Sequence, residues 1–239
     1  MSHILSKSKY IRGLQCDRAL WLDVHNPRLA KYTREQMQRF DRGRDFEYAF
    51  KATFPDGIDI SAELKRNVDA YPERTAQLLD KEEEVDLFEA GFSYDDVLVL
   101  ADVVHKRPDG SLDIYEVKSG TALSETYRRD AALQHYVISH CREIHKFCVV
   151  YCGLSDLSDQ SDSSDQSDLS DQYDYFKVVD LTEELAAQHE EIEKNIAAMK
   201  AIALSTNEPD TPTGAHCLEP YGCPYQTHCQ SGVRQLALF

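Results

Sequence analysis

Two strand-like segments joined by a tight-turn sequence place the strongest constraint on the fold. Residues 96–106 include the apolar run Val-Leu-Val-Leu-Ala-Asp-Val-Val, and Arg-Pro-Asp-Gly at 107–110 is typical of a turn. In the next segment, 111–118, Glu116 and Lys118 are two positions apart, so both side chains leave one face of a strand. We therefore expect a β-hairpin that brings Asp102 beside Glu116 and Lys118.

This set of side chains suits phosphodiester hydrolysis. A carboxylate inside an apolar strand is costly unless it meets a cation. Carboxylate oxygens bind Mg²⁺ or Mn²⁺, which polarise a phosphate and activate water, and a lysine offsets developing charge. The alternative is a structural ion pair at a sheet edge.

The remaining patterns predict an α/β fold with a central mixed sheet flanked by helices, in one domain spanning 1–239. Periodicity predicts helices at 6–23, 33–54, 66–82, 124–142 and 181–204, and further strands at 85–93, 146–153 and 173–179.

Two of these helices carry a polar residue on an apolar stripe. Glu47 shares a stripe with Met37, Phe40, Gly43 and Phe50, and Gln134 shares one with Tyr127, Ala131, Ile138 and Cys141. Each is either a satisfied buried polar group or part of the site.

The order Gly43-x-x-x-Glu47, Asp102, Glu116-Val117-Lys118 and then Gln134 resembles the PD-(D/E)XK superfamily, specifically RecB-like nucleases and CRISPR-associated exonucleases. The resemblance implies a restriction-endonuclease-like core that cleaves DNA with Mg²⁺ or Mn²⁺. It implies that Asp102, Glu116 and the Val117 carbonyl bind metal, and that Lys118 is the catalytic lysine. Gln134 matches the family's glutamine, and Glu47 stands where the family often has a histidine ligand. The family's tyrosine one turn after the glutamine is missing, since Tyr136 follows only two residues on.

One early cysteine and three late ones flank this core. Cys217, Cys223 and Cys229 are separated by five residues each, and Cys16 lies near the start of the chain. This arrangement resembles the [4Fe–4S]-bearing members of the superfamily, including the AddB branch, and implies a cluster that ties the N- and C-terminal regions together. A zinc site with His216 or His228, or free thiols, are the alternatives. Cys141, Cys148 and Cys152 fit core positions.

Charge is unevenly distributed along the acidic chain. The net charge is −16, but residues 1–51 hold eleven Lys/Arg against six Asp/Glu, which favours the N-terminal part as the phosphate-facing surface. Residues 155–172 are six Ser-Asp triplets, for which we expect a disordered loop between two strands. Because no signal peptide or membrane span is recognisable, we expect a cytoplasmic protein.

The last five residues, Gln235-Leu-Ala-Leu-Phe239, resemble the peptide that docks bacterial replication and repair proteins on the DNA polymerase sliding clamp. The resemblance implies that Gln235, Leu236, Leu238 and Phe239 contact the clamp. A hydrophobic tail folded onto its own domain is the alternative.

Together these features predict a metal-dependent DNA nuclease, more specifically an exonuclease, acting in DNA repair, replication or defence. The alternative is a non-catalytic iron–sulfur protein of the same fold that binds nucleic acid or serves as a scaffold. The complete set of Asp102, Glu116 and Lys118 favours the enzyme.

Overall fold

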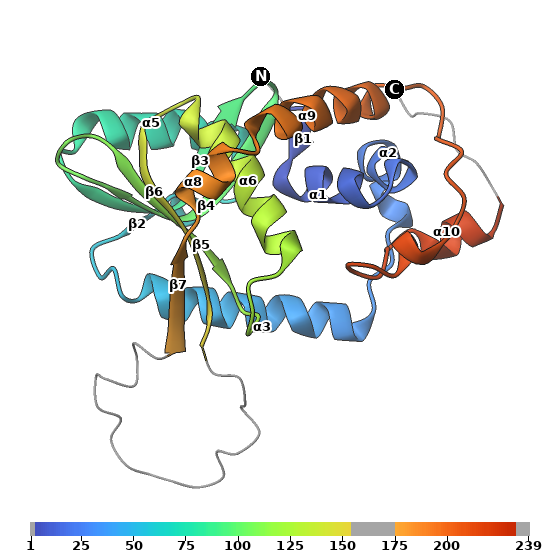
Figure 1. Cartoon of the computed structure of the whole chain (residues 1–239), viewed down its shortest axis with the longest axis horizontal. Helices are drawn as coiled ribbons and strands as arrows, with labels where there is room; N and C mark the ends of the chain where they lie inside the picture. The colour runs from blue at the N-terminus through green and yellow to red at the C-terminus, as the bar shows by residue number, and fades with distance from the viewer. Residues whose placement is uncertain (1–2, 154–174, 233–239) are drawn as a thin grey trace, which may run out of the picture.

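A mixed, open β-sheet forms the centre of the computed structural model, which describes residues 3–153 and 175–232. Strands lie in the order β2-β3-β4-β5-β6-β7, and β1 also pairs with β4 (Figure 1). Their bounds are β1 Leu5–Ser6, β2 Ile58–Asp59, β3 Val85–Tyr94, β4 Val97–Lys106, β5 Leu112–Lys118, β6 Ile144–Cys152 and β7 Phe176–Asp180. The central β3-β4-β5 meander is antiparallel, whereas β5 and β6 are parallel.

Helices flank this sheet, as the sequence patterns predict. They are α1 Lys7–Gln15, α2 Asp17–His25, α3 Arg34–Lys51, α4 Ile60–Leu64, α5 Tyr71–Lys81, α6 Glu125–Ser139, α8 Thr182–Ala186, α9 His189–Ala203 and α10 Gln226–Gln230, with short 3₁₀ turns at Pro27–Leu29, Val68–Ala70 and Ala215–Cys217. None of the helices in the described ranges is long and apolar enough to cross a bilayer.

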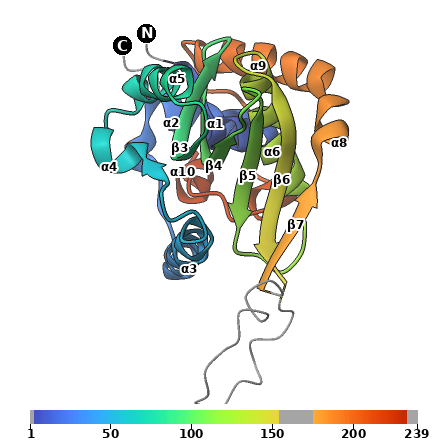
Figure 2. The ribbon, with the colours of Figure 1, turned by 90° about the vertical axis from the view of Figure 1, so that its left-hand side faces the viewer.

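Two apolar clusters hold the helices against the sheet. The larger one packs the sheet against α1, α5, α6 and α9. The smaller one joins Phe46 and Phe50 of α3 to Phe88, Val103 and Val117 of the sheet. Figure 2 shows α3 lying apart from α6 and α9. The helix α3 therefore packs on the sheet through the smaller cluster, whereas α1, α5, α6 and α9 pack on it through the larger one.

The predicted hairpin is confirmed. Val103 pairs with Tyr115 and Lys106 with Leu112, and the Gly110 N–H donates to Arg107 O at 2.9 Å to close the turn. Gly110 has φ of +90°, a conformation that costs a glycine little.

Two of the expected helices are divided in the structure. Cys16 has an extended backbone, φ −167° and ψ 123°, and separates α1 from α2 within the predicted helix 6–23. The predicted helix 181–204 becomes α8 and α9, with Ala187 and Gln188 between them. Neither break coincides with Gly or Pro, so no local residue pattern predicts it. The Ser-Asp segment 155–172 and the tail 235–239 lie outside the described residues.

Candidate functional site

A local irregularity in the sheet places two carboxylates opposite each other. Phe88 pairs with Val103 and Ala90 with Ala101, so Glu89 faces Asp102 across β3 and β4. Glu89 has φ of +54°, which is rare for a residue with a side chain. Leu87 and Ala90 both belong to the larger core although they are three residues apart, so the side-chain alternation shifts phase at Glu89.

Asp102 also lies where β4 and β5 separate. The last pair that they form before this point is Val103 with Tyr115. Beyond it, the Val117 N–H donates to Asp102 Oδ2 at 2.7 Å, so a side chain replaces the missing ladder partner. This bond fixes the Asp102 carboxylate in the opening between the two strands.

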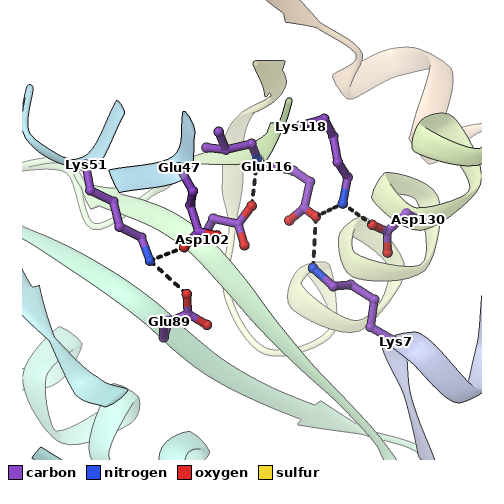
Figure 3. Close-up of polar contacts among 9 residues, drawn as sticks. Lys7, Glu47, Lys51, Glu89, Asp102, Glu116, Lys118 and Asp130 are labelled. Atoms are coloured by element: carbon purple, nitrogen blue, oxygen red, sulfur yellow. Dashed lines mark hydrogen bonds and ion pairs between the residues drawn. The ribbon is translucent and has the colours of Figure 1, made fainter. Parts of the chain in front are cut away.

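The third carboxylate comes from α3. Phe46 and Phe50 anchor the C-terminal half of this helix on the smaller core, and Glu47 lies between them. Across residues 3–153 and 175–232, one group of potential metal ligands has all its donor atoms within 4.8 Å of one another, namely Glu47, Glu89 and Asp102. Lys51 binds two of them, at 2.5 Å from Glu47 Oε1 and 2.7 Å from Glu89 Oε1 (Figure 3).

A second polar group lies next to the first, on the α1 and α6 side of the opening. The Glu116 Oε1 atom accepts hydrogen bonds from Lys118 and, at 2.8 Å, from Lys7 of α1. Lys118 also donates to Asp130 of α6. Figure 3 shows Asp102 between this group and the carboxylates of Glu47 and Glu89.

Burial and neighbouring charge shift the pKa values of these groups in different directions. Burial, followed by the charge of Glu116, raises the pKa of Asp102 well above its usual value. Burial would also raise the pKa of Glu116, but the ammonium groups of Lys118 and Lys7 lower it instead. Lys118 keeps a raised pKa despite its burial because Asp130 and Glu116 favour its charged form. Negative charge at Asp102 is therefore the least well compensated.

The charges of the site leave room for one divalent cation. When every carboxylate is ionised, three ammonium groups face five carboxylates, a balance of 3 − 5 = −2, with Lys7, Lys51 and Lys118 against Glu47, Glu89, Asp102, Glu116 and Asp130. Convergent carboxylate oxygens are the ligands that Mg²⁺ and Mn²⁺ prefer. The Oε2 atom of Glu116 is buried with no hydrogen-bond partner among the described residues, so it can serve such an ion as well. The donor set fits a hard divalent metal.

The predicted site residues lie in two neighbouring groups, apart from Gln134. Glu47 and Asp102 come together, while Glu116 and Lys118 form the neighbouring ion-pair group. Gln134 is fully buried on α6, one turn after Asp130, and its amide atoms make no hydrogen bond with a described residue. The predicted stripe on α3 is wrong in its first half, because Met37 and Phe40 are about half exposed. That half of the helix extends beyond the sheet.

Four members of the site were not anticipated from the sequence, namely Lys7, Lys51, Glu89 and Asp130. Glu89 interrupts the apolar run Leu87-Phe-Glu-Ala-Gly-Phe92 just as Asp102 interrupts its own, so the same signal could have identified it. Asp130 precedes Gln134 by four residues and shares its helix face. Lys7 gave no signal, because a lysine at the start of a helix is common on protein surfaces.

The cysteines near the two ends of the chain pack around shared aromatic side chains. Cys16, Cys223 and Cys229 contact the cluster that contains Trp21 and Tyr225. Burial raises the pKa of Cys16 and of Cys223, and the nearby Cys217 thiol raises both further.

Within the described ranges, no three of these thiol sulfurs lie within 4.8 Å of one another. The histidines of the zinc alternative are placed differently. His228 Nε2 lies 3.1 Å from Glu208 Oε1, whereas His216 Nε2 lies 3.6 Å from Cys217 Sγ.

Comparison with known proteins assigns no family to the chain. No protein-family model matches the chain, and no curated protein matches it in sequence.

Proposed function

We propose that this chain is a divalent-metal-dependent nuclease of the RecB-like type that hydrolyses phosphodiester bonds in DNA. The observation that carries the proposal is the convergence of Glu47, Glu89 and Asp102 within 4.8 Å beside the Glu116–Lys118 pair. With every carboxylate ionised, the site has two carboxylates in excess of its ammonium groups, and a bound divalent cation would compensate both.

Each side chain has a distinct role in this proposal. Glu47, Glu89 and Asp102 hold the cation, with Glu116 and the Val117 carbonyl as further ligands that the resemblance suggests. When bound, Mg²⁺ or Mn²⁺ would polarise the phosphate and lower the pKa of a water molecule. Lys51 restrains Glu47 and Glu89 through its two ion pairs and so keeps the ligands together.

Lys118 supplies positive charge near the scissile phosphate. Glu116 and Asp130 hold its ammonium group, and its raised pKa keeps it protonated at neutral pH. A protonated lysine can donate to a phosphoryl oxygen and stabilise the charge that develops there. Asp130 is a positioning residue, since it acts through Lys118.

We further propose that Cys16, Cys217, Cys223 and Cys229 hold a [4Fe–4S] cluster. The raised pKa values of Cys16, Cys223 and Cys229, caused first by burial and further by neighbouring thiols, support this proposal together with their packing around Trp21 and Tyr225. A four-iron cluster holds its thiolates farther apart than a single zinc ion does, so it suits sulfurs that are not in close contact. Docking on the sliding clamp through 235–239 also stays a proposal.

The test is a cleavage assay with end-labelled single- and double-stranded DNA in Mn²⁺, Mg²⁺ or EDTA. We expect metal-dependent cutting by the wild type, and cutting at least about 100-fold slower by Asp102→Asn and by Lys118→Met. Glu183→Gln, which changes an exposed acid on α8, is the matched control and should cut normally. Cutting in EDTA, or normal cutting by Asp102→Asn, would contradict the proposal.

A further inference from the structure

A cavity of about 440 Å³ opens beside the carboxylate site. It lies between α1, α3, α6 and the Tyr221–Gly222 segment, and its lining includes the partly buried or buried Lys7, Lys118 and Asp130 of the neighbouring polar group. Figure 1 shows α3 running below α1 and α6 with the C-terminal segment beside them. The cavity therefore leads from the surface to the lysine that we place at the scissile phosphate.

Aromatic side chains form much of the cavity wall. Tyr32 and Phe40 meet edge to face with ring centroids 5.9 Å apart, yet they are 47% and 49% exposed. Tyr127 and Tyr221 also line it and are partly buried. Large aromatic side chains left exposed around a hollow are typical of a binding surface rather than of a core.

Positive charge accompanies these rings. Four cationic side chains line the cavity, namely Lys7, Arg12, Arg39 and Lys118. Lys7 and Lys118 also pair with carboxylates of the neighbouring site, and Arg12 lies 3.5 Å from Asp23. The guanidinium of Arg39 lies 5.8 Å from the Tyr221 ring centroid, and Lys118 Nζ lies 5.8 Å from that of Tyr127. Two of the cations thus lie close to aromatic rings of the wall.

We propose that this cavity binds single-stranded DNA by stacking unpaired bases on Tyr32, Phe40, Tyr127 and Tyr221. The aromatic rings fit bases, and the cations fit the phosphates between them. A duplex hides its bases inside the stack, so the rings favour single strands. This proposal rests on the proposed function, which makes DNA the substrate. It identifies the site that would bind the strand next to the Glu116–Lys118 pair.

The experiment measures binding without cleavage. Fluorescence anisotropy in EDTA compares a labelled thymidine oligonucleotide, a duplex of equal length and a strand of the same length with abasic sites. The proteins are the wild type, the double variant Tyr32→Ala/Phe40→Ala, and Tyr48→Ala as the control. Tyr48 is 63% exposed on the same helix but does not line the cavity. Circular dichroism checks that each variant is folded.

We expect the double variant to bind the thymidine strand roughly tenfold more weakly or worse, whereas Tyr48→Ala binds like the wild type. The abasic strand should bind the wild type and the double variant equally weakly, because stacking is what the variant removes. The duplex should bind the wild type less tightly than the single strand does.

Equal binding of the thymidine strand by the wild type and the double variant would overturn the base-stacking site. So would equal losses in the double variant and Tyr48→Ala, or a duplex bound as tightly as the single strand. Because EDTA prevents metal-dependent cleavage, this result is separate from the nuclease test. Loss of single-strand binding in the double variant supports the site even where the wild type cuts no DNA, an outcome that would overturn only the proposed function.

Discussion

At the scale of single residues, the site depends on an unfavourable backbone conformation at Glu89. Its φ of +54° turns the side chain out of the regular alternation of β3 and toward Asp102. Non-glycine residues in this region carry a conformational cost and cluster at functional sites. The paired residues on both sides of Glu89 thus hold it in a conformation that points its carboxylate toward Asp102, and this conformation lowers the stability of the fold.

A pair of substitutions separates the backbone cost from the side-chain loss. Glu89→Ala and Glu89→Gly both remove the carboxylate, but only alanine keeps the Cβ atom that clashes at positive φ. We expect Glu89→Gly to be more stable than Glu89→Ala by about 1 kcal/mol in urea denaturation. Both variants should lose metal-dependent cutting. An alanine variant as stable as the glycine variant would show that the backbone relaxes once the carboxylate is gone.

His135 makes stability depend on pH. It is buried on α6, a hydrogen bond of 2.8 Å joins its Nδ1 to His189 Nε2, and burial followed by the charge of His189 lowers its pKa to about 4. The unfolded chain therefore binds the proton more readily, and stability is lost as the pH falls from about 6.5 toward 4. The full shift corresponds to about 3 kcal/mol.

Urea midpoints measured between pH 7.5 and pH 4.5 should therefore fall more steeply for the wild type than for His135→Gln. His3→Gln, at a partly exposed histidine beside Asp69, serves as the control and should follow the wild type. Parallel pH profiles for all three proteins would contradict the assignment to His135.

At the scale of helices and strands, two glycines lie where the distance to the neighbouring element is very different. A Cβ atom on Gly91 of β3 would lie 2.5 Å from Tyr71 Cβ and 2.9 Å from the Pro72 nitrogen, at the start of α5. On Gly43 of α3 it would lie 3.9 Å from the Ser119 hydroxyl, an ordinary contact.

We expect Gly91→Ala to destabilise the protein by about 2 kcal/mol or more, because α5 would have to move off the sheet. Gly43→Ala should instead stabilise it by about 1 kcal/mol, since alanine is the better residue inside a helix. Urea denaturation of the two variants measures both effects. A Gly91→Ala protein as stable as the wild type would contradict this close packing of α5 against β3.

The elements also show how far sequence reasoning extends. The hairpin was predictable because a turn sequence joins two apolar strands, and the pairing of Glu116 with Lys118 followed from strand geometry. The partnership of Glu89 with Asp102 was not, because it depends on register between strands and on a phase shift that no local pattern encodes. Likewise, the apolar stripe of α3 could not reveal that the first half of this helix lacks a sheet beneath it.

At the scale of the whole molecule, hydrogen bonds join the N-terminal helices to the C-terminal segment. Gln15 Nε2 donates to His216 O at 2.8 Å and to Tyr221 O at 2.7 Å, and the Lys31 N–H donates to Pro224 O at 2.9 Å. A buried ion pair of 2.5 Å links Arg18 to Glu208. The regions that carry Cys16 and the three late cysteines are thus held together by the fold, and the proposed [4Fe–4S] cluster would reinforce this contact.

This contact leads to a prediction about the cofactor. Anaerobically purified protein should be brown, with iron and sulfide in a ratio near one. Cys16→Ser should lose this colour and unfold at a lower temperature, because a ligand that links distant parts of the chain is removed. The fold itself should persist in circular dichroism, since hydrogen bonds from α1 and α2 still hold the C-terminal segment.

Cys141→Ser provides the matched control, because Cys141 lies after α6, where its Sγ donates to Ser93 O at 3.5 Å. It should keep both the colour and the unfolding temperature. Colour that survives in Cys16→Ser, or that disappears equally in Cys141→Ser, would contradict the assignment of Cys16 as a ligand. A colourless wild type holding one zinc ion per chain would replace the iron–sulfur proposal with a zinc site, and His216 would then be the first histidine to substitute.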